Sequence, residues 1–253
     1  MKVESGIPLD ARRRPSEGRW IRRRDNGTAT DLRINTLPTL YGEDISIRLL
    51  ERESDLRTLD SLGLLPRQMH ELIAMINSPG GLVLVTGPTV SGKTTTLYAC
   101  LQNLNNGSRK INTIEDPVEY AVPGLRQSQV NPLLEIDFPE MLRSVLRQAP
   151  DVIMVGEIRD PLTAQTAVRA ANSGHVVLAT LHAPIAAGAI QSMLSLDVHP
   201  HFFSSCLRGV VTQRLVRSLC PECKCAYDIS ESPLTFEEVN GFLEPGQGDK
   251  LYS

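Results

Sequence analysis

The order of hydrophobic and polar positions divides the chain into a β-rich first part and an alternating α/β second part. Residues 1–52 contain two stretches, "TATDLRINTL" and "DISIRLL", in which polar and apolar residues alternate as they do in half-buried strands. Turn signals with glycine stand at Asn26-Gly27 and at Gly42. The polar stretch "ERESDLRTLD" follows, and we predict a linker at residues 53–60.

Beyond residue 60, short apolar runs alternate with segments of helical period. The runs "GLVLVTG", "KINTIED", "DVIMVGE" and "HVVLATLH" predict buried strands. Helices are predicted in "LPRQMHELIAMIN", from about Lys93, from Asp137 with Glu140 as a capping box, in "DPLTAQTAVRAANSG" with Asp160 as N-cap and Gly174 as stop, and in "FSSCLRGVVTQRLV". Apolar strands separated by helices favour a parallel sheet that is covered on both faces.

The stretch "TGPTVSGKTTTL" has the spacing of a phosphate-binding P-loop. A predicted strand leads into it and a predicted helix leaves it, so that backbone N–H groups and the positive end of the helix face the phosphates. Lys93 is expected to contact the β- and γ-phosphates, and the Thr94 hydroxyl is expected to bind Mg²⁺. The predicted nucleotide-binding residues are Gly87, Pro88, Thr89, Val90, Ser91, Gly92, Lys93, Thr94 and Thr95.

Val90 is unusual in such a loop. The position three after the first glycine commonly takes a positive φ, which glycine adopts freely and a β-branched residue does not. We therefore expect weakened ATP binding and turnover. Either Val90 is held in a strained conformation, or the loop relaxes around it and loses a hydrogen bond.

Carboxylates and histidines follow several of the predicted strands. Gly156 and Glu157 end "DVIMVGE", where a carboxylate can hold Mg²⁺ or orient a water, or can be a surface glutamate without a role. Glu115 and Asp116 stand at the corresponding place after another strand. His182, after "HVVLATL", either has a structural role or donates a hydrogen bond to a γ-phosphate.

Composition narrows the class of protein. The chain has 253 residues, 41% of them hydrophobic, with no apolar run near the length of a membrane span and no signal peptide, so we expect a soluble intracellular protein. The net charge of −3 gives no support to nucleic-acid binding over the whole surface. Residues 1–33 nevertheless hold nine Lys/Arg against five Asp/Glu. The clusters "ARRRP" and "RWIRRR" indicate either a solvated strand face or a contact with a partner or phosphate.

Four segments together resemble one family. "GPTVSGKTTTLY", "INTIEDPVEY", "RQAPDVIMVGEIRDPLTAQTAVRAANSGH" and "LRGVVTQRLVRSLCPEC" are similar, in this order, to the Walker A, Asp-box, Walker B and His-box signatures of the secretion ATPases that drive type II secretion and type IV pilus assembly. The resemblance extends upstream through "DLRINTLPTLYGEDISIRLL". It implies an α/β protein with a RecA-like P-loop NTPase core and a parallel sheet, preceded by the end of a PAS-like domain. The implied divisions are a PAS-like part at 1–52, a linker at 53–60, the ATPase core at 61–218 and a partial cysteine subdomain at 219–253.

The resemblance also implies roles for individual residues. Glu115 and Glu157 become the acids that organise Mg²⁺ and water, and the resemblance leaves open which of them is the general base. His182 becomes the γ-phosphate sensor. Arg33 and Arg48 match arginines that reach the nucleotide from the N-terminal domain.

The cysteine pattern indicates an incomplete metal site. Three cysteines crowd into "LCPECKC", which is typical of metal ligation in a cytosolic protein rather than of a disulfide framework. Export and assembly ATPases of the family carry two Cys-x-x-Cys pairs, and a tetrahedral Zn²⁺ site needs four ligands. Here Cys220 and Cys223 form one pair, and Cys225 lies too close to Cys223 to replace the second. We expect a Zn²⁺ half-site without stoichiometric zinc, in a chain truncated at both ends.

The resulting hypothesis is an ATPase motor subunit at the cytoplasmic face of the inner membrane that powers type II secretion or type IV pilus assembly. It implies ATP and Mg²⁺, a homo-hexamer, and inner-membrane platform and adaptor proteins as partners. The alternative is a degenerate ring subunit that binds nucleotide and hydrolyses it poorly, since "LHAPIAA" departs from the usual Thr-Asn-Asp after the His-box histidine. A RecA-type DNA motor is disfavoured by the Asp and His boxes and by the acidic core, so no nucleic-acid partner is expected.

Overall fold

The computed structural model describes most of the chain. The described residues are 2–9, 14–23, 29–51, 57–131, 134, 136–224, 226–228 and 250–252. They divide into two compact units, Met1–Gln213 and Arg214–Ser253.

The first unit begins with a three-stranded antiparallel sheet in the order β1-β2-β3. Its strands are β1 (Ser16–Arg23), β2 (Ala29–Thr39) and β3 (Gly42–Glu51). The β2–β3 hairpin closes at the Thr39–Gly42 pair, and Gly42 has a φ of 142°, so the turn predicted at Gly42 is confirmed. The turn predicted at Asn26-Gly27 lies outside the described residues. The PAS-like identity of this part stays a prediction.

A six-stranded sheet in the order β6-β5-β7-β8-β4-β9 forms the centre of this unit, and every one of its strand pairs is parallel. The strands are β4 (Gly81–Thr86), β5 (Ile111–Glu115), β6 (Arg126–Gln129), β7 (Val152–Val155), β8 (Val176–Leu181) and β9 (Leu207–Thr212). The four strands predicted from apolar runs are therefore confirmed. The two edge strands, β6 and β9, were not predicted.

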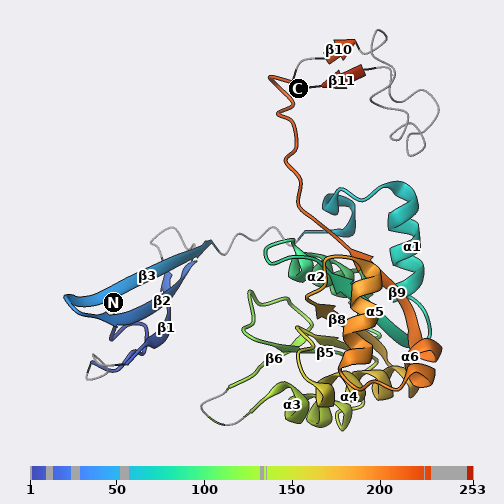
Figure 1. The fold of residues 1–253 in the computed structure, drawn as a ribbon, viewed down its shortest axis with the longest axis horizontal. Coiled ribbons are helices and arrows are strands. Elements are labelled where there is room, and N and C mark those ends of the chain that lie inside the picture. Colours follow the sequence, from blue (N-terminus) through green and yellow to red (C-terminus); the bar gives the residue numbers. More distant parts are fainter. Residues whose placement is uncertain are drawn as a thin grey trace. The chain divides into compact units, whose positions relative to one another are not determined.

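Helices cover both faces of this sheet (Figure 1). They are η1 (Leu59–Leu62), α1 (Pro66–Ile76), α2 (Lys93–Leu104), α3 (Phe138–Leu146), α4 (Pro161–Asn172), α5 (Ala186–Ser195) and α6 (Pro200–Cys206). Alternate residues of β4 point to opposite faces. Val83 and Val85 join the cluster formed with η1, α1 and α2, whereas Leu82 and Leu84 join the cluster formed with α3 to α6. The predicted parallel sheet covered on both faces is thus confirmed.

The N-caps predicted at Asp137 and Asp160 set the starts of two helices, although for α3 only the Asp137 half of the predicted capping box is formed among the described contacts. The Asp137 side chain accepts a hydrogen bond from the Glu140 N–H at 2.9 Å at the start of α3. The Asp160 side chain accepts one from the Thr163 N–H at 2.8 Å at the start of α4, with Pro161 in the first position. Both carboxylates satisfy a backbone donor that has no partner within the helix.

The helix predicted in "FSSCLRGVVTQRLV" is wrong, because α6 ends at Cys206 and the chain continues directly into strand β9. The valines at 210 and 211 suit a strand that pairs along β4. Gly209 supports the same conclusion, since a Cβ there would lie 2.1 Å from the Met75 sulfur of α1. A glycine in a helix interior is unfavourable, whereas here it permits close packing of α1 on the sheet.

Replacing Asp160 by alanine is expected to lower the free energy of unfolding by about 1 kcal/mol, within a range of about 0.5–2 kcal/mol, because the N-cap of α4 is lost. Urea denaturation followed by circular dichroism measures this change. Asp160→Asn keeps an acceptor oxygen and should recover most of the loss. Equal destabilisation by the two substitutions would show that the cap is not the source of the effect.

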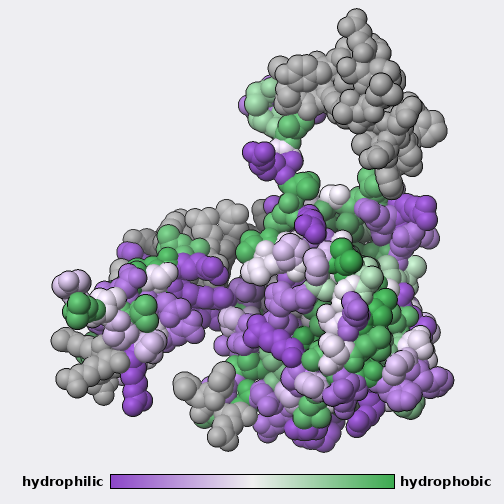
Figure 2. Space-filling view, in the orientation of Figure 1, coloured by the Kyte–Doolittle hydropathy of each residue, from purple (hydrophilic) through white to green (hydrophobic). Residues whose placement is uncertain are grey.

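The second unit has a short antiparallel pair, β10 (Ala226–Asp228) with β11 (Lys250–Tyr252). Within the described part of the chain, no helix is both long and apolar enough to cross a membrane. Figure 2 shows hydrophilic and hydrophobic residues interspersed over the visible face of the α/β core.

Candidate functional site

The loop between β4 and α2 lies at the carboxyl end of the parallel sheet. Three of its residues have a positive φ: Gly87 (151°), Val90 (63°) and Gly92 (85°). Val90 is the one that is not glycine, and its side chain is exposed (82%). The positive φ expected from the sequence at this position is therefore present, and a β-branched residue holds it.

Gln213 supports the P-loop through two hydrogen bonds. It follows β9 directly, and its backbone N–H donates to the Thr86 carbonyl at 3.0 Å. Its side-chain amide donates to the Ser91 carbonyl at 2.7 Å. A Cβ on Gly87 would lie 2.4 Å from the Gln213 carbonyl oxygen, so the loop has no room for a larger residue at its start.

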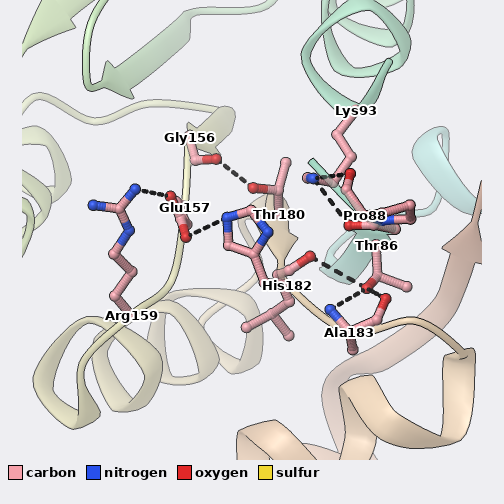
Figure 3. A network of polar contacts seen from close by, with 11 residues as sticks. Thr86, Pro88, Lys93, Gly156, Glu157, Arg159, Thr180, His182 and Ala183 are labelled. Atoms are coloured by element: carbon pink, nitrogen blue, oxygen red, sulfur yellow. Dashed lines mark hydrogen bonds and ion pairs between the residues drawn. The ribbon is translucent and has the colours of Figure 1, made fainter. Parts of the chain in front are cut away.

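Lys93 begins α2 and folds back over the loop (Figure 3). Its ammonium group donates to the carbonyl of Gly87 at 3.0 Å and to that of Pro88 at 2.9 Å. Burial lowers the pKa of Lys93, and the negative charge of Glu157 opposes that effect. A cation is thus held beside the backbone N–H groups of the loop and the N-terminus of α2, an arrangement that favours anions.

A cavity of about 260 Å³ opens beside this loop. It is lined by Thr89, Val90, Lys93, Thr94, Leu97, Glu115, Asp116, Pro117, Glu119, Phe138, Met154, Gly156, Glu157, Thr180 and His182. The structure therefore brings together the predicted lysine, threonine, two acids and histidine, which come from four separate strand ends. The Thr94 hydroxyl and the carboxylates are hard oxygen donors of the kind that Mg²⁺ takes, so the donor set fits that ion.

Glu157 lies between two basic side chains just after β7 (Figure 3). The His182 Nε2 is 2.8 Å from Glu157 Oε1, and the Arg159 guanidinium pairs with the other carboxylate oxygen. The Thr180 hydroxyl donates to the Gly156 carbonyl at 2.5 Å and joins β8 to the residue before the acid. The acid and the predicted sensor histidine are thus in direct contact.

Glu115, at the end of β5, is the most buried acid of the site, with 2% exposure. One carboxylate oxygen accepts from the Tyr98 hydroxyl. The other accepts from the Thr113 hydroxyl and from the Gln127 amide, the latter at 3.2 Å. Burial, and then the neighbouring Glu115, raises the pKa of Tyr98, so the phenol keeps its proton and remains a donor.

The predicted arginines lie on the N-terminal sheet. Arg33 of β2 is paired in register with Arg19 of β1 and with Arg48 of β3, which places three arginines in one row across the strands. The Arg33 guanidinium donates to Glu119 Oε2 at 2.6 Å, and Glu119 lines the cavity. Arg48 does not line the cavity. The nucleotide contact of both arginines stays a prediction.

His175, the other histidine that brackets β8, lies at the opposite end of that strand. Its Nδ1 is 2.9 Å from the Ala170 carbonyl, and the residue belongs to a separate depression near Asp151. It takes no part in the site beside the P-loop.

Cys220 and Cys223 are exposed residues of the second unit. Hydrogen bonds from the backbone of Glu222 and Cys223 lower the pKa of Cys220. Cys225 lies outside the described residues. Among the described residues, no group of three or more histidines, cysteines or acids is placed to hold a metal ion.

We expect the purified chain to hold less than one tightly bound Zn²⁺, because one Cys-x-x-Cys pair supplies only part of the tetrahedral ligand set. Elemental analysis before and after a mild chelator measures the metal. One Zn²⁺ per chain that survives the chelator would contradict this. Adding a second Cys-x-x-Cys pair beyond residue 253 should create chelator-resistant binding.

The sequence prediction missed several polar residues of the site. Gln213 was hidden by the wrong assignment of β9 as a helix. Gln127 lies on β6, a strand too polar to be recognised from hydrophobic pattern. Tyr98 is indistinguishable in the sequence from a core residue of α2. A positional signal was available only for Gln213, which directly follows β9 at the carboxyl end of the sheet, where α/β sheets bind ligands.

Comparison with known proteins also indicates a relationship to secretion and pilus ATPases. The sequence model of the type II/IV secretion system protein family matches residues 1–246. The type II secretion system ATPase E of Vibrio cholerae is 46% identical over 228 residues, which are 90% of this chain and 45% of that protein. The type IV pilus assembly ATPase PilB of Thermus thermophilus is 42% identical over 252 residues, which are 100% of this chain and 28% of that protein.

Solved structures agree in fold. The pilus retraction motor PilT with bound ADP has a TM-score of 0.67 at 32% identity, over 81% of this chain and 60% of that chain. The ATPase DotB of Legionella pneumophila has the same TM-score at 26% identity, over 81% of this chain and 59% of that chain. The chain spans about half the length, or less, of the curated relatives named above. With its P-loop, its parallel sheet and a family match that covers most of its residues, the chain belongs to the type II/IV secretion system protein family and has the RecA-like fold of the secretion ATPases.

Proposed function

We propose that the chain is an ATP-hydrolysing motor subunit of a secretion or pilus-assembly machine. The observation that carries the proposal is the cavity beside the P-loop, where Lys93, Thr94, Glu115, Glu157 and His182 converge. Neither a plain binding module nor a structural subunit needs two acids and a histidine at the place where a γ-phosphate would lie. The family to which the chain belongs supports the same reading.

In this proposal, each of the cavity residues has a separate role in the transfer of the γ-phosphoryl group to water. Lys93 leaves the carbonyl groups of the loop and contacts the phosphates, while the loop N–H groups surround them. Thr94 and the acids would hold Mg²⁺, which would neutralise charge on the phosphate oxygens. Glu115 or Glu157 accepts the proton of the attacking water. His182 donates from Nε2 to the γ-phosphate, and doing so requires it to leave Glu157, which it contacts at 2.8 Å.

The larger assembly is proposed from the relatives. Proteins named as type II secretion and type IV pilus assembly ATPases are both similar to this chain, with somewhat higher identity on the secretion side. We propose a homo-hexamer at the cytoplasmic face of the inner membrane, in which the row of Arg19, Arg33 and Arg48 lies over the nucleotide. Its partners would be the platform and adaptor proteins of the machine, and no nucleic acid. Light scattering with Mg²⁺ and a non-hydrolysable ATP analogue measures the ring.

Phosphate release by the purified chain tests the function. ATP with Mg²⁺ should give steady release that EDTA stops and that DNA does not stimulate. Lys93→Ala, purified in the same way, reports any contaminating ATPase, whereas Lys110→Ala removes a lysine that contacts the Gln148 carbonyl away from the cavity and should be active. Release that persists unchanged in Lys93→Ala would overturn the assignment of this site.

One observation favours the degenerate subunit as a second candidate. Val90 holds the loop at a φ of 63°, where glycine is usual, and this geometry is compatible with binding but slow turnover. ATP binding by calorimetry without phosphate release, in a chain that forms rings, would establish that alternative.

A further inference from the structure

Tyr98 connects the P-loop helix to the acid at the end of β5. It lies on α2, the helix that Lys93 begins, and its side chain is completely buried. Its hydroxyl donates to Glu115, and its ring packs edge-on against Tyr120 with a centroid distance of 4.6 Å. Because the hydroxyl is one of the few polar atoms in this apolar layer, the contact fixes both the ring and the carboxylate.

Gln127 holds the same carboxylate from the other side. Its amide nitrogen lies 3.2 Å from Glu115 Oε1, 3.3 Å from the Tyr98 hydroxyl and 3.1 Å from the Tyr120 carbonyl. Its amide oxygen accepts from the Val122 N–H at 2.7 Å. The side chain therefore joins the acid, the tyrosine and the segment after β5 in one hydrogen-bonded network.

The donors to Glu115 are all neutral. Among the described residues, its partners are the two hydroxyls of Tyr98 and Thr113 and the amide of Gln127, and no ion pair is formed. Glu157 differs, since it pairs with Arg159 and contacts His182. Neutral donors orient a carboxylate without cancelling its charge, so the Glu115 charge stays available to a cation or a water in the cavity.

We propose that Tyr98 and Gln127 are positioning residues that hold the Glu115 carboxylate in its reactive orientation and tie that orientation to the P-loop helix. The proposal rests on the ATPase function proposed above. It predicts that both residues affect the rate of the chemical step and that neither affects the binding of ATP.

The first test is the kinetics of Tyr98→Phe, which removes the hydroxyl and keeps the ring. We expect kcat to fall on the order of 10- to 100-fold, with KM and the Kd for ADP within about twofold, since misplacing a catalytic group costs about that much. Tyr120→Phe removes the neighbouring hydroxyl, which has no hydrogen bond among the described residues, and should have no effect. An unchanged kcat in Tyr98→Phe, with an active wild type, would overturn the proposal and leave the ATPase function intact.

Gln127 has a matched control on the same strand. Gln129 also accepts from the segment after β5, through the Val118 N–H at 3.1 Å, and it is the β6 partner of Glu115 in the strand register, but its side chain makes no hydrogen bond to the Glu115 carboxylate. Gln127→Leu should therefore lower kcat by at least about tenfold more than Gln129→Leu, in line with the cost of a misplaced acid. Equal losses of kcat in the two variants would show that both glutamines act only by holding the segment after β5. That result would overturn the proposal that Gln127 positions Glu115.

A double-mutant cycle gives a readout that needs no hydrolysis. Urea unfolding of Tyr98→Phe, Glu115→Ala and the double variant should show effects that do not add, because the first substitution removes the donor and the second removes the acceptor of the same hydrogen bond. Additive effects would overturn the contact itself. Non-additive effects in a chain that releases no phosphate would overturn the ATPase function and, with it, the positioning role.

Discussion

Replacing Glu157 by glutamine should lower kcat for ATP hydrolysis by at least about 100-fold, the range that removing a general base or a charge-stabilising group commonly costs. Glutamine keeps the shape of the side chain but loses the charge that Mg²⁺ or the attacking water would meet. It also removes the ion pair with Arg159 and leaves a single acceptor oxygen, where Arg159 and His182 now contact the two oxygens of Glu157. ATP should still bind, since Lys93 and the loop remain, and a trapped ATP-bound state is the expected product.

Phosphate release under saturating ATP measures the effect on the rate of hydrolysis, and calorimetry measures the effect on ATP binding. Glu71→Gln is a suitable control, because it removes an acid that is also paired with an arginine, Arg67, at 2.9 Å on the exposed face of α1. That variant should retain full activity. If Glu157→Gln kept more than a tenth of the wild-type rate, Glu157 could be neither the base nor a ligand that the reaction needs.

Replacing Val90 by glycine should tighten ATP binding and raise turnover. A β-branched residue at a φ of 63° is expected to cost about 1–3 kcal/mol, and glycine adopts that conformation freely. If the whole cost falls on binding, the affinity gain is about 5- to 150-fold, at tenfold per about 1.4 kcal/mol. Any part of the strain that the free protein already bears should appear as increased stability instead. The prediction therefore concerns ATP affinity, measured by calorimetry, and the free energy of unfolding, measured by urea unfolding.

Ala149 provides the matched control, because it also has a positive φ, of 48°, in the turn after α3 and does not line the cavity. Ala149→Gly should change stability without changing ATP affinity, and it corrects for the extra flexibility that glycine gives the unfolded chain. Equal ATP affinities, rates and stabilities in wild type and Val90→Gly, within twofold for the first two, would show that the loop accommodates valine without strain.

The central strands and the chemistry at their ends were predictable from the sequence for a physical reason. A strand buried on both faces needs an unbroken apolar run, and the polar residue that follows each run must lie at the carboxyl edge of the sheet. The pattern therefore predicts that Lys93, Glu115, Glu157 and His182 lie together, and in the structure all four line one cavity.

The edges of the sheet were not predictable in the same way. Strand β6 is polar because one side of an edge strand faces the segment after β5, so its glutamines resemble a loop. Strand β9 follows α6 without a break, and its apolar residues fit a helical period as well as a strand. The partners of Glu115 were invisible for another reason. Tyr98 and Gln127 lie on a helix and a strand on either side of β5 in the sequence, and only the packing of α2 and β6 against β5 brings them to one carboxylate.

The hydroxyl of Thr86 holds the main chain on both sides of His182. It accepts from the Ala183 N–H at 3.0 Å, and it lies within donating distance of the carbonyl groups of Leu181 and Ala183, at 3.2 and 2.6 Å (Figure 3). The main chain on both sides of the histidine is thereby clamped to the strand that enters the P-loop. If His182 senses the phosphate as proposed, its imidazole would exchange Glu157 for the phosphate by rotating about its own side-chain bonds while the main chain stays in place.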